Sequence, residues 1–231
     1  DQSTTDTTTG SWETTGQYPL IGKYDAATTE FFNGFIDEVK VYNYARTASQ
    51  VNADFQKSAS AEGTSTRLGA SNQSFLSNGL VGYWKMDEAS WTSDCSTEEV
   101  LDFSGNSNNG ESCPNGAAND PVGGKFGNAG SFDGTNDYVL VDDTSSLSPT
   151  TQVTISQWIY PTAAGRSQAD LTTIWKGDIS VSTDQSYGLI FMDTRAIVMR
   201  IGSSSTFDQA TSTSVLTLNT WTHVVGTYDG K

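Results

Sequence analysis

The clearest pattern in the sequence is an alternation of apolar and polar residues over residues 32–44 (FNGFIDEVKVYNY), close to the N-terminus. A glycine turn leads into this run, and a repeat of two residues is typical of a β-strand in a packed sheet. The strict repeat predicts that one face carries Phe35, Asp37, Val39 and Val41, and that the other carries Ile36, Glu38, Lys40 and Tyr42.

The same repeat recurs along the chain. Residues 153–161 (VTISQWIYP) alternate with large side chains on both faces, which indicates a strand in the middle of a sheet. Shorter runs predict further strands at 20–24, 79–88, 124–134, 137–143, 172–176, 187–192, 197–201 and 221–230.

One short helix is expected after residue 46. Thr47 followed by Gln50 forms a capping-box pattern, and Val51 and Phe55 lie four residues apart on one apolar face. The following residues, 58–75, are rich in Ser, Ala, Gly and Thr without any repeat, and we interpret them as a flexible linker.

Composition narrows the class of protein. The 231 residues carry a formal net charge of -15 with a sequence pI near 4.1, which argues against nucleic acid and anionic membranes as partners. The sequence has no apolar run long enough for a transmembrane helix. Cys95 and Cys113 lie in one loop-rich stretch and predict a disulfide, hence an oxidising compartment and a secreted or cell-surface protein.

Several motifs resemble one known family. The run GFIDEVKVYN at 34–43 is similar to the closing strand of laminin-G-like, concanavalin-A-like domains. GLVGYWKMDE at 79–88 resembles their first strand, DFSGNSNNG at 102–110 a following loop, and WTHVVGTYDG at 221–230 a late strand. The resemblance implies an all-β fold, an antiparallel β-sandwich jelly roll with one short helix.

The order of the motifs is unusual for that family. Residues 1–57 resemble the end of such a domain, and residues 76–231 its beginning and middle. A β-sandwich that lacks its closing strands leaves backbone groups unpaired, so another segment has to supply those strands. The chain can complete itself, residues 1–57 can complete the next copy, or the sequence is one period of a tandem array. We expect completion by other copies or adjacent repeats, and hence a head-to-tail fibre or adhesin array. The alternative is a monomeric recognition module of a large secreted protein.

The sequence does not favour an enzyme. Jelly-roll glycosidases need two carboxylates on one strand face, and no E-x-D-x-x-E pattern occurs. The neighbours Asp37 and Glu38 are expected on opposite sides of their strand. His223 lies inside a strand motif, where a structural role is expected.

Calcium is the cofactor that the sequence suggests, in a structural role. Asp102 and Asn106 belong to a loop rich in oxygen ligands. The resemblance places the first and closing strands side by side, which would bring Asp87 towards Asp37. The alternative is an Asx-rich turn in which these side chains bond their own backbone.

Three tryptophans are candidate ligand contacts. Trp12 and Trp91 lie in polar stretches and Trp175 at the end of a predicted strand, whereas Trp84, Trp158 and Trp221 are expected in the core. Exposed rings of this kind would suit a glycan or a cell-surface protein.

Overall fold

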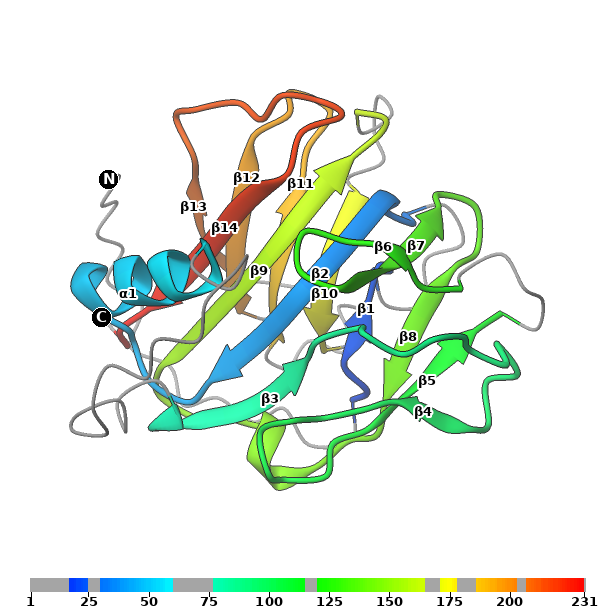
Figure 1. The fold of residues 1–231 in the computed structure, drawn as a ribbon. Helices are drawn as coiled ribbons and strands as arrows, with labels where there is room; N and C mark the ends of the chain where they lie inside the picture. Colours follow the sequence, from blue (N-terminus) through cyan, green and yellow to red (C-terminus); the bar gives the residue numbers. More distant parts are fainter. Residues whose placement is uncertain are drawn as a thin grey trace.

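The computed structural model describes residues 17–24, 30–59, 77–114, 120–164, 171–177, 186–202 and 207–230. Within these ranges the chain forms two antiparallel sheets packed face to face, with a single α-helix, α1 (Ala48–Ala59), on one side (Figure 1). This arrangement confirms the all-β sandwich with one short helix that the sequence predicted.

The larger sheet has eight strands in the part of the chain that the structure describes. Their order is β13 (Phe207–Thr211), β12 (Ile197–Gly202), β11 (Ser186–Phe191), β10 (Leu171–Lys176), β1 (Leu20–Ile21), β8 (Tyr138–Val141), β5 (Gly110–Cys113) and β4 (Glu98–Val100). A 3-10 turn, η2 (Ser145–Leu147), follows β8.

The smaller sheet is built around β2 (Asn33–Tyr42). Its order is β14 (Thr222–Tyr228), β9 (Val153–Pro161), β2, β7 (Asn128–Asp133) and β6 (Val122–Gly123), and β3 (Leu80–Trp84) also pairs with β2. One side of β2 pairs with β9 along most of its length, and the other side pairs first with β7 and then with β3.

All these partners of β2 belong to the same chain. The closing strand β2 therefore lies in the middle of its own sandwich (Figure 1). We expected it to complete another copy, and this arrangement corresponds instead to the alternative in which the chain completes itself. The predicted neighbourhood of the first and closing strands, β3 and β2, is confirmed.

A β-bulge interrupts β2 and overturns the predicted faces. Asp37 lies opposite Trp158 and Lys40 opposite Ser156, so two residues of β2 face a single residue of β9. Glu38 takes the positive φ of 56° at this point. The extra residue shifts the alternation by one position, so that Ile36 shares the core with Val39 and Val41 while Phe35 packs on the outer face beside Tyr160 and Trp221.

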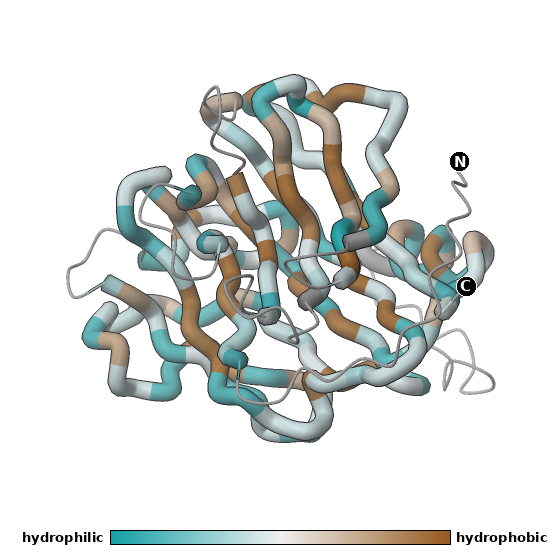
Figure 2. Tube along the Cα trace, turned by 180° about the vertical axis from the view of Figure 1, so that it is seen from behind, coloured by the Kyte–Doolittle hydropathy of each residue, from teal (hydrophilic) through white to brown (hydrophobic). Residues whose placement is uncertain are grey.

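The main core fills the space between the sheets. Trp84 is fully buried there and its indole N–H donates to the Asn108 carbonyl oxygen. Gly82 makes room for this ring, because a Cβ at Gly82 would lie 2.4 Å from the Trp84 side chain. Seen from behind, hydrophobic residues run along the strands of the larger sheet (Figure 2).

Helix α1 is held against the smaller sheet by a buried ion pair. Thr47 and Gln50 form the predicted capping box, with the Thr47 N–H donating to Gln50 Oε1 at 2.9 Å. The guanidinium of Arg46 lies 2.8 Å from Asp54 and over the Tyr42 ring. The side chains of Arg46 and Asp54 are 0% and 7% exposed, so each charge depends on the other.

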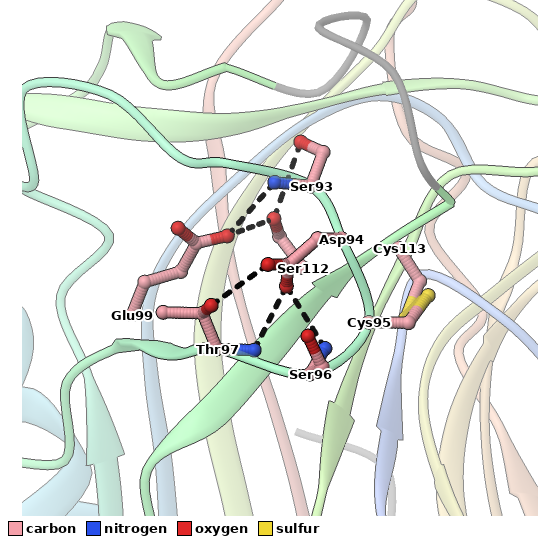
Figure 3. Close-up of a disulfide and its surroundings, with 8 residues drawn as sticks. All are labelled: Ser93, Asp94, Cys95, Ser96, Thr97, Glu99, Ser112 and Cys113. Carbon is pink, nitrogen blue, oxygen red and sulfur yellow. Dashed lines mark hydrogen bonds between the residues drawn. A yellow bond between two sulfur atoms is a disulfide. The ribbon is translucent and has the colours of Figure 1, made fainter.

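The predicted disulfide between Cys95 and Cys113 is confirmed (Figure 3). It joins the loop before β4 to the end of β5, and Glu99 adds hydrogen bonds from Ser93 and Ser112 beside it. In the chain-entropy model, closing a loop of this size contributes roughly 3 kcal/mol to stability.

None of the helices within the described ranges has the length and apolar character that crossing a membrane requires.

We expect Asp54→Ala to lower the free energy of unfolding by about 3 to 5 kcal/mol, because it leaves the buried Arg46 guanidinium without its counter-charge. Urea unfolding at pH 7 measures this loss. The double variant Arg46→Met, Asp54→Leu removes both charges and should lose much less. Equal losses in the two variants would show that packing, and not the ion pair, holds the helix.

Candidate functional site

The outer face of the smaller sheet carries a group of charged and aromatic side chains where β2, β3 and the loop after β4 meet. We call it the acidic–aromatic patch, and it comprises Asp37, Glu38, Lys40, Tyr83, Lys85, Asp87 and Phe103. The alternation of β3 explains part of it, since Tyr83 and Lys85 point outward on either side of the buried Trp84.

The loop over 102–108 presents Phe103 to solvent. The carboxylate of Asp102 accepts four hydrogen bonds, from the backbone N–H groups of Tyr83, Ser104 and Asn108 and from the Ser104 hydroxyl. These bonds fix the loop beside β3 and turn the side chain of Phe103 outward, so that this residue is 49% exposed. Asp102 therefore behaves as the centre of an Asx-type turn, the alternative to a calcium ligand.

The ammonium group of Lys85 lies over the Phe103 ring. Lys85 Nζ is 4.5 Å from the centroid of Phe103 and 5.7 Å from that of Tyr83, and the two rings meet edge to face at 6.3 Å. The Tyr83 hydroxyl donates to Glu38 at 2.7 Å, and Glu38 also pairs with Lys40 at 3.0 Å. Burial and then the charge of Glu38 raise the pKa of Tyr83 well above its usual range. Tyr83 therefore stays a neutral hydrogen-bond donor.

Two carboxylates clamp the turn between β6 and β7. Asp37 accepts the Phe126 N–H and Asp87 accepts the Asn128 N–H, each at 2.9 Å. Gly127 has a positive φ of 65°, and a Cβ there would lie 2.0 Å from an Asp87 oxygen. The close approach of Asp87 to the turn thus requires glycine at this position.

Asp37 is the most perturbed carboxylate of the patch. It is fully buried, and burial, opposed by the Phe126 N–H and reinforced by the charges of Glu38 and Asp87, raises its pKa to about 7. Its Oδ1 atom has no hydrogen-bond partner among the described residues. A buried carboxylate oxygen without a hydrogen-bond partner, under the influence of the charges of Glu38 and Asp87, is the kind of environment that a bound cation would stabilise.

The fit to calcium rests on Asp37 and Asp87. Among the described residues no group of three or more His, Cys, Asp or Glu side chains is arranged to hold a metal ion. Calcium accepts carbonyl and water oxygens, so two carboxylates fit it if such oxygens complete the shell.

The other two predicted ligands, Asp102 and Asn106, form hydrogen bonds that hold their own loop in place. Asn106 donates its amide to the Val81 carbonyl oxygen at 3.2 Å and to Ser104 Oγ at 3.1 Å. Of the four predicted ligands, Asp37 and Asp87 thus bind the same turn between β6 and β7, and the other two lie in a hydrogen-bonded turn of their own.

The bulge in β2 also changes the expected arrangement of neighbouring acids. Asp37 lies opposite Trp158 and Glu38 bonds Tyr83, both on the outer face, so the expectation that they face opposite sides is wrong. Glu38 accepts a hydrogen bond from Tyr83 and forms an ion pair with Lys40, and Asp37 accepts a hydrogen bond from the turn between β6 and β7.

The tryptophans proposed as exposed contacts are buried where the structure describes them. Trp91 is 5% exposed because its loop folds back and packs the ring into the main core beside Gly130. Trp175 is 1% exposed and lies against Tyr24, with its indole N–H donating to the Gly177 carbonyl oxygen. The expectation that these two rings are accessible is therefore wrong, and Trp12 lies outside the described residues.

Phe103 is an exposed ring that the sequence did not single out. A signal was present, because a large apolar residue stands between two polar residues, Asp102 and Ser104, in a loop motif whose polar members bond the backbone. The residue between them has to point away from those contacts.

His223 has the structural role expected of it. Its Nε2 shares a hydrogen bond of 2.9 Å with Ser156 Oγ, and its ring packs against those of Trp158 and Phe55. Burial, together with the charge of Lys40, lowers its pKa to about 4, so the ring is neutral at physiological pH.

Comparison with protein families supports the resemblance seen in the motifs. The Laminin_G_3 model, described as the concanavalin A-like lectin/glucanases superfamily, matches residues 1–52 and 133–231, well over half of the chain. Searches among curated proteins and among solved structures gave no significant match.

We expect Asp37→Asn to stabilise the metal-free protein at neutral pH. The native pKa of Asp37 is raised from 3.8 to about 7, so its contribution to stability is present below pH 4 and is lost as the pH rises through 7. The variant should therefore gain stability over the original chain progressively between pH 4 and 7, by at most about 4 kcal/mol.

Urea unfolding in EDTA at several pH values measures the difference. Asp193→Asn, which removes a carboxylate at an exposed turn, is the matched control. A constant difference between Asp37→Asn and the original chain over this pH range would contradict the raised pKa.

Proposed function

Because the chain belongs to the Laminin_G_3 family of the concanavalin A-like lectin/glucanases superfamily, we propose that it is a non-catalytic module that recognises a carbohydrate. The observation that carries the proposal is the exposed ring of Phe103, which a hydrogen-bonded loop holds beside the ammonium group of Lys85 and several hydrogen-bonding groups. Sugar rings present apolar C–H faces that stack on aromatic side chains, and their hydroxyl groups need polar partners at the edge of the ring.

The surroundings of Phe103 supply such partners. Lys85 is a donor next to the ring, and Glu38 is an acceptor on the adjoining strand. Hydrogen bonds from the backbone fix the loop before any ligand binds, so little conformational entropy is lost on binding.

Calcium is the cofactor that we propose for this module. Asp37 and Asp87 would hold it, and its charge would offset the repulsion between the two carboxylates. A cation there would keep the turn between β6 and β7 rigid, because both carboxylates also bind that turn.

We also propose an extracellular or cell-surface location. The disulfide between Cys95 and Cys113 supports it, since such bonds persist in oxidising compartments. A head-to-tail fibre by strand sharing remains the second proposal, but it would require β2 to leave β3, β7 and β9 of its own chain for those of another copy. The pairing of β2 within the chain therefore favours the recognition module.

We expect Phe103→Ala to weaken carbohydrate binding by about tenfold or more, equivalent to about 1.4 kcal/mol. A glycan array identifies the ligands of the original chain, and calorimetry with the strongest hit gives the affinities. Tyr18→Ala removes an equally exposed ring outside the patch and is the control. The proposal fails if no glycan binds, or if both variants lose the same affinity.

We expect calcium to raise the thermal unfolding temperature, because a ligand that binds the folded state stabilises it by about 2.7 kcal/mol at one hundred times its Kd. Asp37→Asn and Asp87→Asn should abolish the shift, and Asp193→Asn should retain it. Calorimetric scans with calcium and with EDTA test this. A shift that survives in Asp37→Asn would place the cation elsewhere.

A further inference from the structure

The turn between β7 and β8 joins the smaller sheet to the larger one. It carries two acidic residues, Asp133 at the end of β7 and Asp137 directly before β8. Asp133 Oδ1 accepts the backbone N–H groups of Thr135 at 2.7 Å and Asn136 at 3.3 Å, and Asp137 Oδ2 accepts the Asp133 N–H at 2.9 Å. These hydrogen bonds bring both carboxylates to one tight turn.

The start of β2 holds this turn in place. Asn33 donates its side-chain amide to the Asp133 carbonyl oxygen at 2.7 Å, and its backbone carbonyl oxygen accepts the Thr162 N–H at 3.0 Å. Gly134 has a positive φ of 75°, and a Cβ there would lie 2.7 Å from the Asn33 amide nitrogen. The turn therefore has a fixed shape that requires glycine at this position.

Asp137 carries an oxygen without a partner. The residue is fully buried, and its Oδ1 atom forms no hydrogen bond among the described residues. The carboxylate of Asp133 approaches it closely enough for a side-chain hydrogen bond if one of the two carries a proton. The ion pairs in the described part of the chain involve other acids. Two carboxylates in such an arrangement need a proton or a cation between them.

The surroundings favour a cation over a proton. Burial, opposed by the Asp133 N–H and reinforced by the charge of Asp133, raises the pKa of Asp137 to about 6, which reflects the same lack of compensation. Asp133 is exposed, so an ion can reach the pair from solvent. The net charge of -15 also raises the concentration of cations near the surface of the chain.

We propose that the turn between β7 and β8 binds a calcium ion through the carboxylates of Asp133 and Asp137. Calcium accepts oxygens in irregular arrangements, which suits a turn of this kind. Backbone carbonyl and water oxygens would complete its shell, because the described residues hold no group of three or more His, Cys, Asp or Glu side chains that fits a metal ion. The ion would strengthen the connection between the two sheets.

This site is separate from the one proposed at Asp37 and Asp87. Asp87 binds the N–H of Asn128, the first residue of β7, whereas Asp133 is the last residue of that strand. A strand of this length spans roughly 17 Å at about 3.3 Å per residue. Either site can therefore exist without the other, and the inference does not depend on carbohydrate binding.

The experiment titrates calcium chloride into the calcium-free full chain, labelled with nitrogen-15, and follows the backbone amides by NMR. Thr135 and Asn136 report on the turn between β7 and β8, and Phe126 and Asn128 report on the turn between β6 and β7. We expect saturable shifts at Thr135 and Asn136 in the original chain and also in Asp37→Asn.

Two variants remove the proposed ligands. Asp137→Asn and Asp133→Asn keep an oxygen that accepts the hydrogen bonds of the turn, so both should fold, and unchanged amide shifts elsewhere in the spectrum check this. Each should weaken calcium binding at Thr135 and Asn136 by about tenfold or more. Asp142→Asn removes the same charge at an exposed position just after β8 and should bind calcium as the original chain does.

Two results would overturn the proposal. The first is that saturating calcium leaves the amides of Thr135 and Asn136 unshifted. Shifts confined to Phe126 and Asn128 would then limit calcium to the site at Asp37, and a proton would join Asp133 to Asp137. The second is equal calcium affinity of Asp137→Asn, Asp133→Asn and Asp142→Asn at this turn.

Discussion

The pairing of β2 inside its own chain is the interaction on which the rest of the structure depends. This strand lies between β9 on one side and β7 and β3 on the other, so it joins segments from both ends of the sequence into one sheet. Its bulge then sets the outer surface. The additional residue at Glu38 keeps Val39 and Val41 in the core while Asp37, Glu38 and Lys40 come to the outer face beside Tyr83.

Charge burial links this strand to the proposed site. Burying the charged carboxylate of Asp37 costs free energy. The hydrogen bond from the turn between β6 and β7 offsets part of this cost, and the raised pKa of Asp37 reflects the rest. The carboxylate of Asp102, in contrast, accepts hydrogen bonds from four donors. The well-satisfied acid builds a rigid loop that displays Phe103, whereas the poorly satisfied acid is the better candidate to bind a cation.

The sequence predicted the fold well where the physical signal is local. The presence of strands at β2 and β9, the capping box of Thr47 and the pairing of the two cysteines all correspond to the structure. The faces of β2 could not be predicted, because a positive φ at Glu38 has no counterpart in the pattern of apolar residues. The burial of Trp91 depends on how a polar loop folds back over the core, and the exposure of Phe103 depends on long-range bonds between Asp102 and β3. The short strands β4, β5, β6 and β13 carry too few apolar residues to stand out.

The molar mass of the purified chain in solution tests the central claim, that β2 completes its own sandwich. Light scattering coupled to gel filtration, over a wide range of protein concentrations, should give a single species at the chain mass of 24.7 kDa. Because the strand is already paired on both sides, dilution and chelators should not change this value. A ladder of multiples of the chain mass, present at low concentration, would contradict the account and show that β2 is shared between copies.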